Sequence, residues 1–202
     1  MTGGRSSKKC NLSYWETVIL GSHVLYADKR LTALSLENHW AARFWSTDTN
    51  WCIESKSWFE DYRQSGKLVL FRLHNENRRY LLSTSFLEFR NGRNRRLNLR
   101  AFIDRFPNIE MTIRRIIDTD CQALFHFGLA RPHTHFDHSL VLSGLAITSL
   151  PSHLSIRDDL VLRDNPIADL PADLIVGGNL DIRDTRITDI PVGAQIAGKI
   201  VL

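Results

Sequence analysis

The hydrophobic pattern of the last third of the chain repeats every 20 residues. The segments 141–160, 161–180 and 181–200 align without a gap, and the final two residues begin a fourth unit. The apolar columns are Leu142, Leu162, Ile182 and Leu202; Ile147, Ile167 and Ile187; Leu150, Leu170 and Ile190, each before a proline; and Leu160, Leu180 and Ile200. Such a period is typical of solenoids, in which each unit buries its apolar face only against its neighbours. The pattern therefore predicts a β-solenoid of about three coils over residues 140–202.

Apolar and polar positions alternate within each unit. The segments 140–142, 160–162 and 180–182 predict one short parallel strand per coil, and 154–156 and 174–176 predict a second strand on the opposite side. The repeats resemble the short leucine-rich repeats of bacterial and phage proteins, and are similar to the Leu-Pro-containing repeats of secreted bacterial effectors. This resemblance implies the architecture and leaves the partner open.

The preceding residues, 10–130, mix the period of strands with that of helices. Apolar runs predict strands at 14–20, 23–26, 67–74, 79–85 and 86–89. Helical spacing of apolar residues predicts a helix at 31–45, and a capping box from Ser57 to Glu60 predicts a second helix ending near Gln64. Asn98 and Asn108 have the sequence context of N-caps of two later helices. This order of elements predicts an α+β domain.

These patterns divide the chain into four segments. We expect a disordered polar start at 1–9, the α+β domain at 10–130, a histidine-rich linker at 131–139 and the solenoid at 140–202.

Composition narrows the class of protein. Hydrophobic residues make up 43% of the chain, which is enough for a folded core. No run of about 18 apolar residues predicts a membrane-spanning helix, and the polar start has no secretory signal. Three scattered cysteines form neither a disulfide framework nor a CxxC pair. We therefore expect a cytoplasmic protein with no membrane partner.

The net charge of +4 conceals an asymmetry along the chain. Residues 62–115 hold 13 Lys and Arg against 4 Asp and Glu, whereas residues 139–202 hold 5 against 8. A basic middle followed by an acidic repeat can indicate a surface for nucleic acid or for an acidic protein. Charge complementarity within the chain and simple solubility explain the asymmetry equally well.

A second resemblance covers residues 44–107. Its landmarks are Trp51-Cys52, Phe59 and Tyr62, the segment 66–71, Arg79 to Leu82, Glu88-Phe89, and the apolar residues Leu97, Leu99, Phe102 and Phe106 before Pro107. This pattern resembles a domain of phage and plasmid proteins marked by a Trp-Cys-Thr-Ala step. The chain departs from it at Ile53-Glu54. The resemblance implies an origin in a mobile element and implies no reaction.

We assign no catalytic residue and expect no cofactor. The weak candidates are Cys52 as a nucleophile with His39 or His74 as its base, together with Glu88. Nucleophilic chemistry would need these groups to converge in a pocket, whereas a cysteine beside a tryptophan is usually a small core residue.

We also assign no metal site. His133, His135 and His138 are weak candidates because imidazoles suit zinc, and the His-x-His spacing could place two on one face of a strand. The surrounding sequence has no fixed second half of a zinc motif, so a solvated linker is the simpler interpretation.

The arginines of the basic middle are the candidate partner-binding residues. They are Arg78, Arg79, Arg90, Arg93, Arg95, Arg96 and Arg100. Guanidinium groups bind phosphate or carboxylate in a bidentate manner, so the cluster suits nucleic acid or an acidic protein. No RNA-recognition, KH or zinc-finger pattern accompanies it.

The last repeat has no polar cap. Ile200 and Leu202 would expose apolar side chains beside unpaired strand edges, which suggests self-association as a homodimer or burial by a partner.

Three functional hypotheses follow. The first is a non-enzymatic interaction protein of phage or mobile-element type that inhibits or modulates a host complex, such as a defence complex. The second is a transferase-like enzyme whose solenoid selects the target. The third is a nucleic-acid-binding protein that uses the arginines of residues 78–100.

Overall fold

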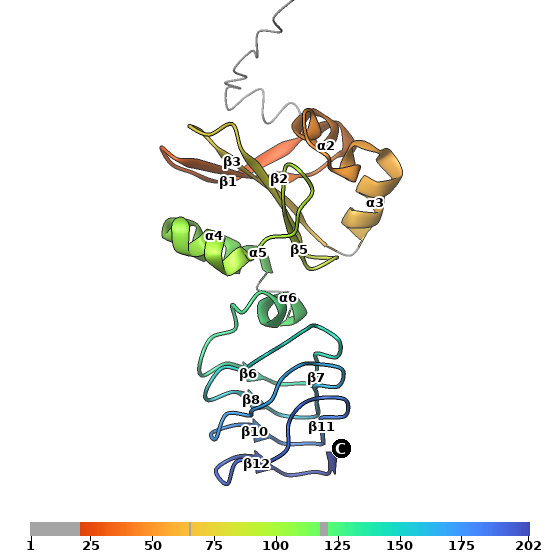
Figure 1. Cartoon of the computed structure of the whole chain (residues 1–202), viewed down its shortest axis with the longest axis vertical. Helices are drawn as coiled ribbons and strands as arrows, with labels where there is room; N and C mark the ends of the chain where they lie inside the picture. The colour runs from red at the N-terminus through yellow and green to blue at the C-terminus, as the bar shows by residue number, and fades with distance from the viewer. Residues whose placement is uncertain (1–20, 65, 118–120) are drawn as a thin grey trace, which may run out of the picture. The chain divides into compact units, whose positions relative to one another are not determined.

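The computed structural model describes residues 21–64, 66–117 and 121–202 (Figure 1). The chain divides into two compact units, Met1–Leu97 and Asn98–Leu202. The disordered start expected at 1–9 and the strand expected at 14–20 lie outside the described residues. The predicted fold class is confirmed: antiparallel sheet and helices come first, and a β-solenoid follows.

A five-stranded antiparallel sheet forms the centre of the first unit. Its strands follow chain order: β1 (Ser22–Ala27), β2 (Leu31–Leu36), β3 (Leu68–Leu73), β4 (Arg79–Ser83) and β5 (Glu88–Asn91). The middle strand β3 pairs Leu34 with Leu70 on one side and Leu70 with Leu81 on the other. The predicted hairpin at 67–85 is therefore present.

The predicted helix at 31–45 is wrong in its first half. Residues 31–36 form strand β2, and helix α2 (His39–Ser46) begins only after Asn38. The Asn38 side chain accepts a hydrogen bond from the backbone N–H of Ala41 at 2.9 Å, which is an N-cap. Strand β2 lies between two other strands, so nearly all of its side chains are buried. Its sequence therefore lacks the alternation of apolar and polar residues that marks a half-exposed strand, and the spacing of its apolar residues is compatible with a helix.

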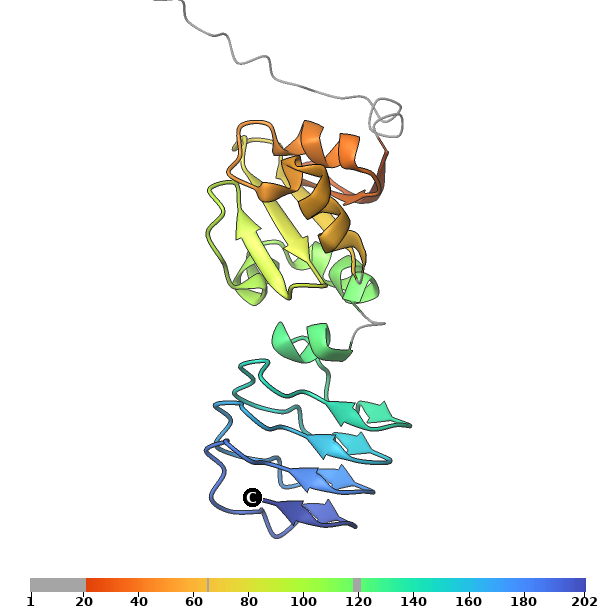
Figure 2. The same cartoon turned by 90° about the vertical axis from the view of Figure 1, so that its right-hand side faces the viewer.

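Two helices and a short 3-10 turn cover one face of this sheet (Figure 2). They are α2, η1 (Cys52–Glu54) and α3 (Lys56–Gln64). Their apolar side chains share a core with the sheet: Leu34, Leu36, Ala41, Ala42, Trp45, Trp51, Ile53, Phe59, Tyr62, Leu68, Leu70 and Leu81. Helix α3 starts at Lys56, so Ser57 lies in its first turn and is not the predicted cap.

The second unit starts with short helices. They are α4 (Leu99–Arg105), the 3-10 turn η2 (Pro107–Ile109), α5 (Glu110–Ile117) and α6 (Cys121–His126). The prediction of Asn98 as an N-cap is confirmed, because its side chain accepts from the N–H of Ala101 at 3.1 Å. Asn108 is not a cap, since it lies inside η2.

Two parallel ladders of two-residue strands build the solenoid (Figure 2). One contains β6 (His135–Phe136), β8 (Ser155–Ile156), β10 (Ile175–Val176) and β12 (Gln195–Ile196). The other contains β7 (Leu140–Val141), β9 (Leu160–Val161), β11 (Leu180–Asp181) and β13 (Ile200–Val201). Each pairing joins residues 20 positions apart, such as Leu140 with Leu160, so the sequence period is the coil length. Both strands predicted for each coil are present.

The predicted linker at 131–139 is instead part of the first coil. His135 and Phe136 form β6, which pairs with β8, and the Phe136 side chain is buried. The three histidines of this segment are exposed and obscure the apolar pattern, whereas Phe136 continues the buried column of Ile156 and Val176.

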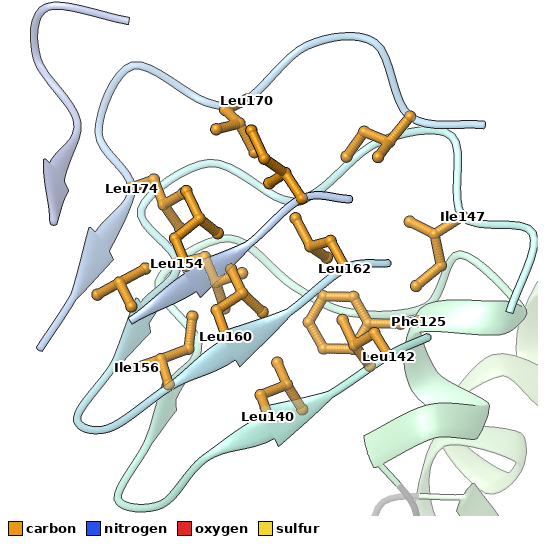
Figure 3. Packing of buried hydrophobic residues seen from close by; sticks show 14 of the residues in the cluster. Phe125, Leu140, Leu142, Ile147, Leu154, Ile156, Leu160, Leu162, Leu170 and Leu174 are labelled. Carbon is orange, nitrogen blue, oxygen red and sulfur yellow. The ribbon is translucent and has the colours of Figure 1, made fainter. Parts of the chain in front are cut away.

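Helix α6 covers the first coil. Phe125 joins the apolar core of the solenoid, and its ring centroid lies 6.1 Å from that of Phe136 (Figure 3). Gln122 donates to the carbonyl of Val141 at 3.1 Å, and His126 Nδ1 lies 2.9 Å from the carbonyl oxygen of Leu145. At the other end, β12 and β13 are the edge strands of the described ladders.

A buried asparagine fixes the bend between coils. Asn165 donates from Nδ2 to the carbonyls of Leu142 at 2.8 Å and Leu162 at 2.7 Å, and its Oδ1 accepts from the N–H of Ile147 at 2.9 Å. The side chain thus ties two successive coils together where their backbones turn and leave polar groups unpaired by strands.

Candidate functional site

Two of the weak catalytic candidates lie around one small cavity in the first unit. η1 places Cys52, and β5 places Glu88, on a cavity that also borders Trp51, Tyr62 and Arg90. The cavity holds about 10 Å³, which is room for no more than one water molecule. No substrate of ordinary size fits there.

Glu88 is an anchor for arginines. Its buried carboxylate accepts two hydrogen bonds from Arg90, both at 2.7 Å, and also pairs with Arg96. The hydrogen bonds from Arg90 lower the pKa of Glu88, burial opposes them, and the hydrogen bond from Arg96 lowers the pKa further. A carboxylate held ionised between two guanidiniums is a poor general base.

Tyr62 closes the same cavity. Cys52 Sγ lies 3.9 Å from the Tyr62 hydroxyl oxygen. Burial of the phenol, followed by the neighbouring Cys52 and Glu88, raises the pKa of Tyr62 to about 12. The phenol therefore stays neutral at physiological pH.

Neither candidate histidine is hydrogen-bonded to Cys52. His39 Nε2 lies 2.7 Å from the carbonyl oxygen of Glu54. For His74, Nε2 is 2.7 Å from Thr32 Oγ1, and Nδ1 is 3.3 Å from the carbonyl oxygen of Lys29. Within the part of the chain that the structure describes, nucleophile and base are not brought together.

An open depression lies on the outer side of the same Trp51-Cys52 segment. It spans about 500 Å³ and is lined by Arg43, Trp51, Cys52, Glu54, Ser55 and Trp58. We call it the α2–α3 depression. Helix α2 supplies Arg43, η1 supplies Cys52 and Glu54, and α3 supplies Trp58. Its lining thus combines two tryptophans with one basic and one acidic side chain.

Two tryptophans are exposed at this part of the surface. Trp58 is 50% exposed and Trp40 is 67% exposed. Trp40 precedes Arg43 by three residues on α2, so the two side chains lie on the same side of that helix. Large exposed aromatics on a folded domain commonly mark a contact surface, and Trp and Arg dominate the binding energy of protein interfaces.

Sequence analysis missed these three residues. The signal was the N-cap at Asn38, which sets the helix start and thereby places Ala41, Ala42 and Trp45 inside and Trp40 and Arg43 outside.

Most of the predicted partner-binding arginines have partners within their own unit. Arg90 and Arg96 pair with Glu88, Arg78 pairs with Glu76, and Arg79 donates to the backbone carbonyls of Trp45 and Thr47. Arg100 belongs to the second unit and pairs with Asp104 and Glu110. In the described ranges, only Arg93 and Arg95 of this set lack an ion-pair or side-chain hydrogen-bond partner, and both are exposed.

The three candidate metal ligands have three different sets of neighbours. The His133 ring stacks on His153, His135 Nε2 lies 2.9 Å from Asp137 Oδ1, and His138 packs edge-on against Phe136. Residues 21–64, 66–117 and 121–202 contain no cluster of three or more His, Cys, Asp or Glu that could hold a metal ion. The His-x-His spacing therefore reflects the outward positions of a coil.

The predicted self-association residues lie on the last coil. Ile200 is 41% exposed and Leu202 is 86% exposed, beside the edge strand β13. Self-association through them stays a prediction.

Comparisons with protein-family models, with curated proteins and with solved structures found no match. In the described parts of the chain, no helix is long and apolar enough to cross a membrane. The function must therefore be argued from the surface itself.

Proposed function

We propose that this chain is a non-enzymatic interaction protein that docks on a partner protein through the α2–α3 depression and the exposed Trp40 beside it. The observation that carries the proposal is the exposure of Trp40 and Trp58 next to Arg43, which has no ion-pair partner among the described residues. Burying two such side chains on binding would remove a large apolar area from water.

The cavity at Cys52 and Glu88 supports this choice over the transferase hypothesis. It has room for one water molecule, Glu88 is occupied by Arg90 and Arg96, and neither His39 nor His74 contacts the thiol by a hydrogen bond. Of its original cluster, the nucleic-acid hypothesis retains Arg93 and Arg95 without a carboxylate partner. The exposed Arg78, Arg96 and Arg100 each pair with a carboxylate.

We further propose that the partner belongs to a host or mobile-element complex in the cytoplasm, and that binding inhibits or modulates it, as an anti-defence protein would. The support is the resemblance of residues 44–107 to a domain of phage and plasmid proteins, and of residues 140–202 to the short repeats of bacterial and phage proteins. In this proposal the solenoid supplies a second, accessory surface, and its last coil can also join two copies.

The test is capture of a protein from host lysate by three full-length chains: wild type, W40A/W58A, and V24A/L25A as a control that also truncates two partly exposed apolar residues of the first unit. We expect wild type and control to retain the same protein and W40A/W58A to lose it. Equal retention by all three chains would overturn the proposal.

A further inference from the structure

The two charged residues that line the α2–α3 depression indicate which kind of ligand can bind there. Arg43 and Glu54 both line the depression and both are exposed. Within the described residues, neither side chain has an ion-pair partner, and they do not pair with each other. Two other charged side chains of α3 are paired, Lys56 with Glu60 at 3.6 Å and Arg63 with Glu37 at 3.0 Å. Among the described residues Asp61, also on α3, has no ion pair.

The rest of the lining is mostly apolar. It consists of Trp51, Cys52, Ser55 and Trp58, of which Trp58 is the exposed tryptophan. An open depression of about 500 Å³ with two tryptophans in its lining is large enough to contact a large apolar side chain.

We propose that the α2–α3 depression binds a short peptide segment in which a large apolar residue is flanked by an acidic residue, which contacts Arg43, and by a basic residue, which contacts Glu54. This inference rests on the docking function proposed above and specifies the chemistry of the partner. Two opposite charges in the lining favour one direction of the bound segment, because a reversed segment would place like charges together.

Nucleic acid fits this surface less well. Residues 37–64, which include α2, η1 and α3, carry three Lys and Arg against five Asp and Glu, a net charge of −2. A phosphate backbone crossing the depression would meet Glu54 as well as Arg43, and affinity for nucleic acid depends mainly on phosphate contacts with cations.

The experiment is selection of randomised heptapeptides displayed on phage, with full-length wild type, R43E, E54R and W58A as baits. The wild type should enrich segments with a large apolar residue next to an acidic residue on one side and a basic residue on the other. Peptides enriched on R43E should carry Lys or Arg where those on wild type carry an acidic residue. Peptides enriched on E54R should carry Asp or Glu where those on wild type carry a basic residue. W58A should enrich no peptide. R78E is the matched control, since Arg78 is exposed on the β3–β4 turn, and it should select as wild type does.

A selected peptide, made synthetically and labelled, then gives the affinity by fluorescence anisotropy. We expect R43E or E54R to weaken it by about tenfold or more, and the R43E/E54R double variant to prefer the peptide with its two charges exchanged. A labelled twelve-residue oligothymidine is titrated in parallel.

The inference is overturned if R43E and E54R select the same sequences as wild type, or if oligothymidine binds and W58A abolishes that binding while no peptide is enriched. These outcomes are separable from failure of the docking function. Loss of the lysate protein from W40A/W58A with full retention by R43E and E54R would leave the docking function standing and remove this inference alone.

Discussion

The imidazole rings of His133 and His153 stack in parallel, with centroids 4.2 Å apart and planes inclined by 8°. The two residues are 20 positions apart, and each lies in a left-handed turn, with φ of 60° and 53°. The next position of the same column is Asp173, whose Oδ1 accepts from the N–H of His153 at 2.8 Å and whose Oδ2 lies 3.2 Å from its Nδ1. The column shows how the solenoid uses side chains to stabilise strained turns.

Removal of the Asp173 carboxylate should therefore destabilise the solenoid. D173A loses the acceptor for the N–H of His153, and we expect the free energy of unfolding to fall by roughly 1 kcal/mol. D173N keeps an acceptor oxygen and should lose less. Urea denaturation, monitored by circular dichroism, measures the free energy of unfolding of both variants. D169A, which truncates an exposed aspartate, is the control. Equal loss in D169A would refute the specific role of the column.

Asn165 should matter more than Asp173, because its side chain is buried and joins two coils. N165A leaves the carbonyls of Leu142 and Leu162 and the N–H of Ile147 without this partner, so we expect a loss of roughly 2–4 kcal/mol. Thr185 holds the same position in the next coil, where its hydroxyl donates to the carbonyl of Ile182 and accepts from the N–H of Ile187, both within its own coil. T185A, measured in the same urea titration, should cost no more than half as much.

Glu88 should make the stability of the first unit sensitive to acid. Its pKa is lowered in the folded protein, so its contribution is present above the ordinary value of 4.5 and is lost as the pH falls through the lower folded value. We expect E88Q to cost roughly 1–3 kcal/mol at pH 7, because it leaves the guanidinium of Arg90 without its anion. The difference between wild type and E88Q should shrink below pH 4.5. A difference that stays constant down to acid unfolding would contradict this role.

Tyr62 should make the stability of the first unit sensitive to high pH. Its pKa of about 12 in the folded chain exceeds the ordinary value of 10. Its contribution to the free energy of unfolding is therefore present below pH 10 and is lost as the pH rises towards 12. Ultraviolet titration of tyrosinate should show one phenol that ionises near pH 12 in wild type and is missing in Y62F. If Y62F removes a phenol that ionises near pH 10, the burial of Tyr62 is not what controls its ionisation.

The sequence was most informative where the fold repeats. A 20-residue period reduces strand pairing to a single register, so Leu140, Leu160 and Leu180 could be placed in one ladder without any knowledge of the rest of the chain. The first strand of the first coil, β6, was missed because Phe136 is the only large apolar residue between Arg131 and Ser139. Its match to Ile156 and Val176 becomes clear only when the period is extended upstream.

The site was harder to predict, because it depends on which side chains the sheet and helices leave exposed. Leu34, Asn38, Ala41 and Trp45 fit one helix by spacing, and only pairing of residues 31–36 with β3 divides them. Two arginines of the predicted cluster, Arg90 and Arg96, are paired because β5 buries Glu88 between them. Local sequence does not encode the burial of Glu88, so the number of unpaired arginines was overestimated. The surface at Trp40 and Trp58 was overlooked because the start of helix α2 was misplaced.

The central claim is that the surface around Trp40, Arg43 and Trp58 contacts a partner protein. The most direct measurement is photo-crosslinking in the producing host, with p-benzoylphenylalanine placed at position 40, 58 or 25 of the full-length chain. Positions 40 and 58 replace exposed tryptophans by another aromatic group, and position 25 is a partly exposed control on β1. We predict that positions 40 and 58 crosslink the same protein and that position 25 does not. Absence of a crosslink from both 40 and 58, or an equal crosslink from 25, would contradict the account.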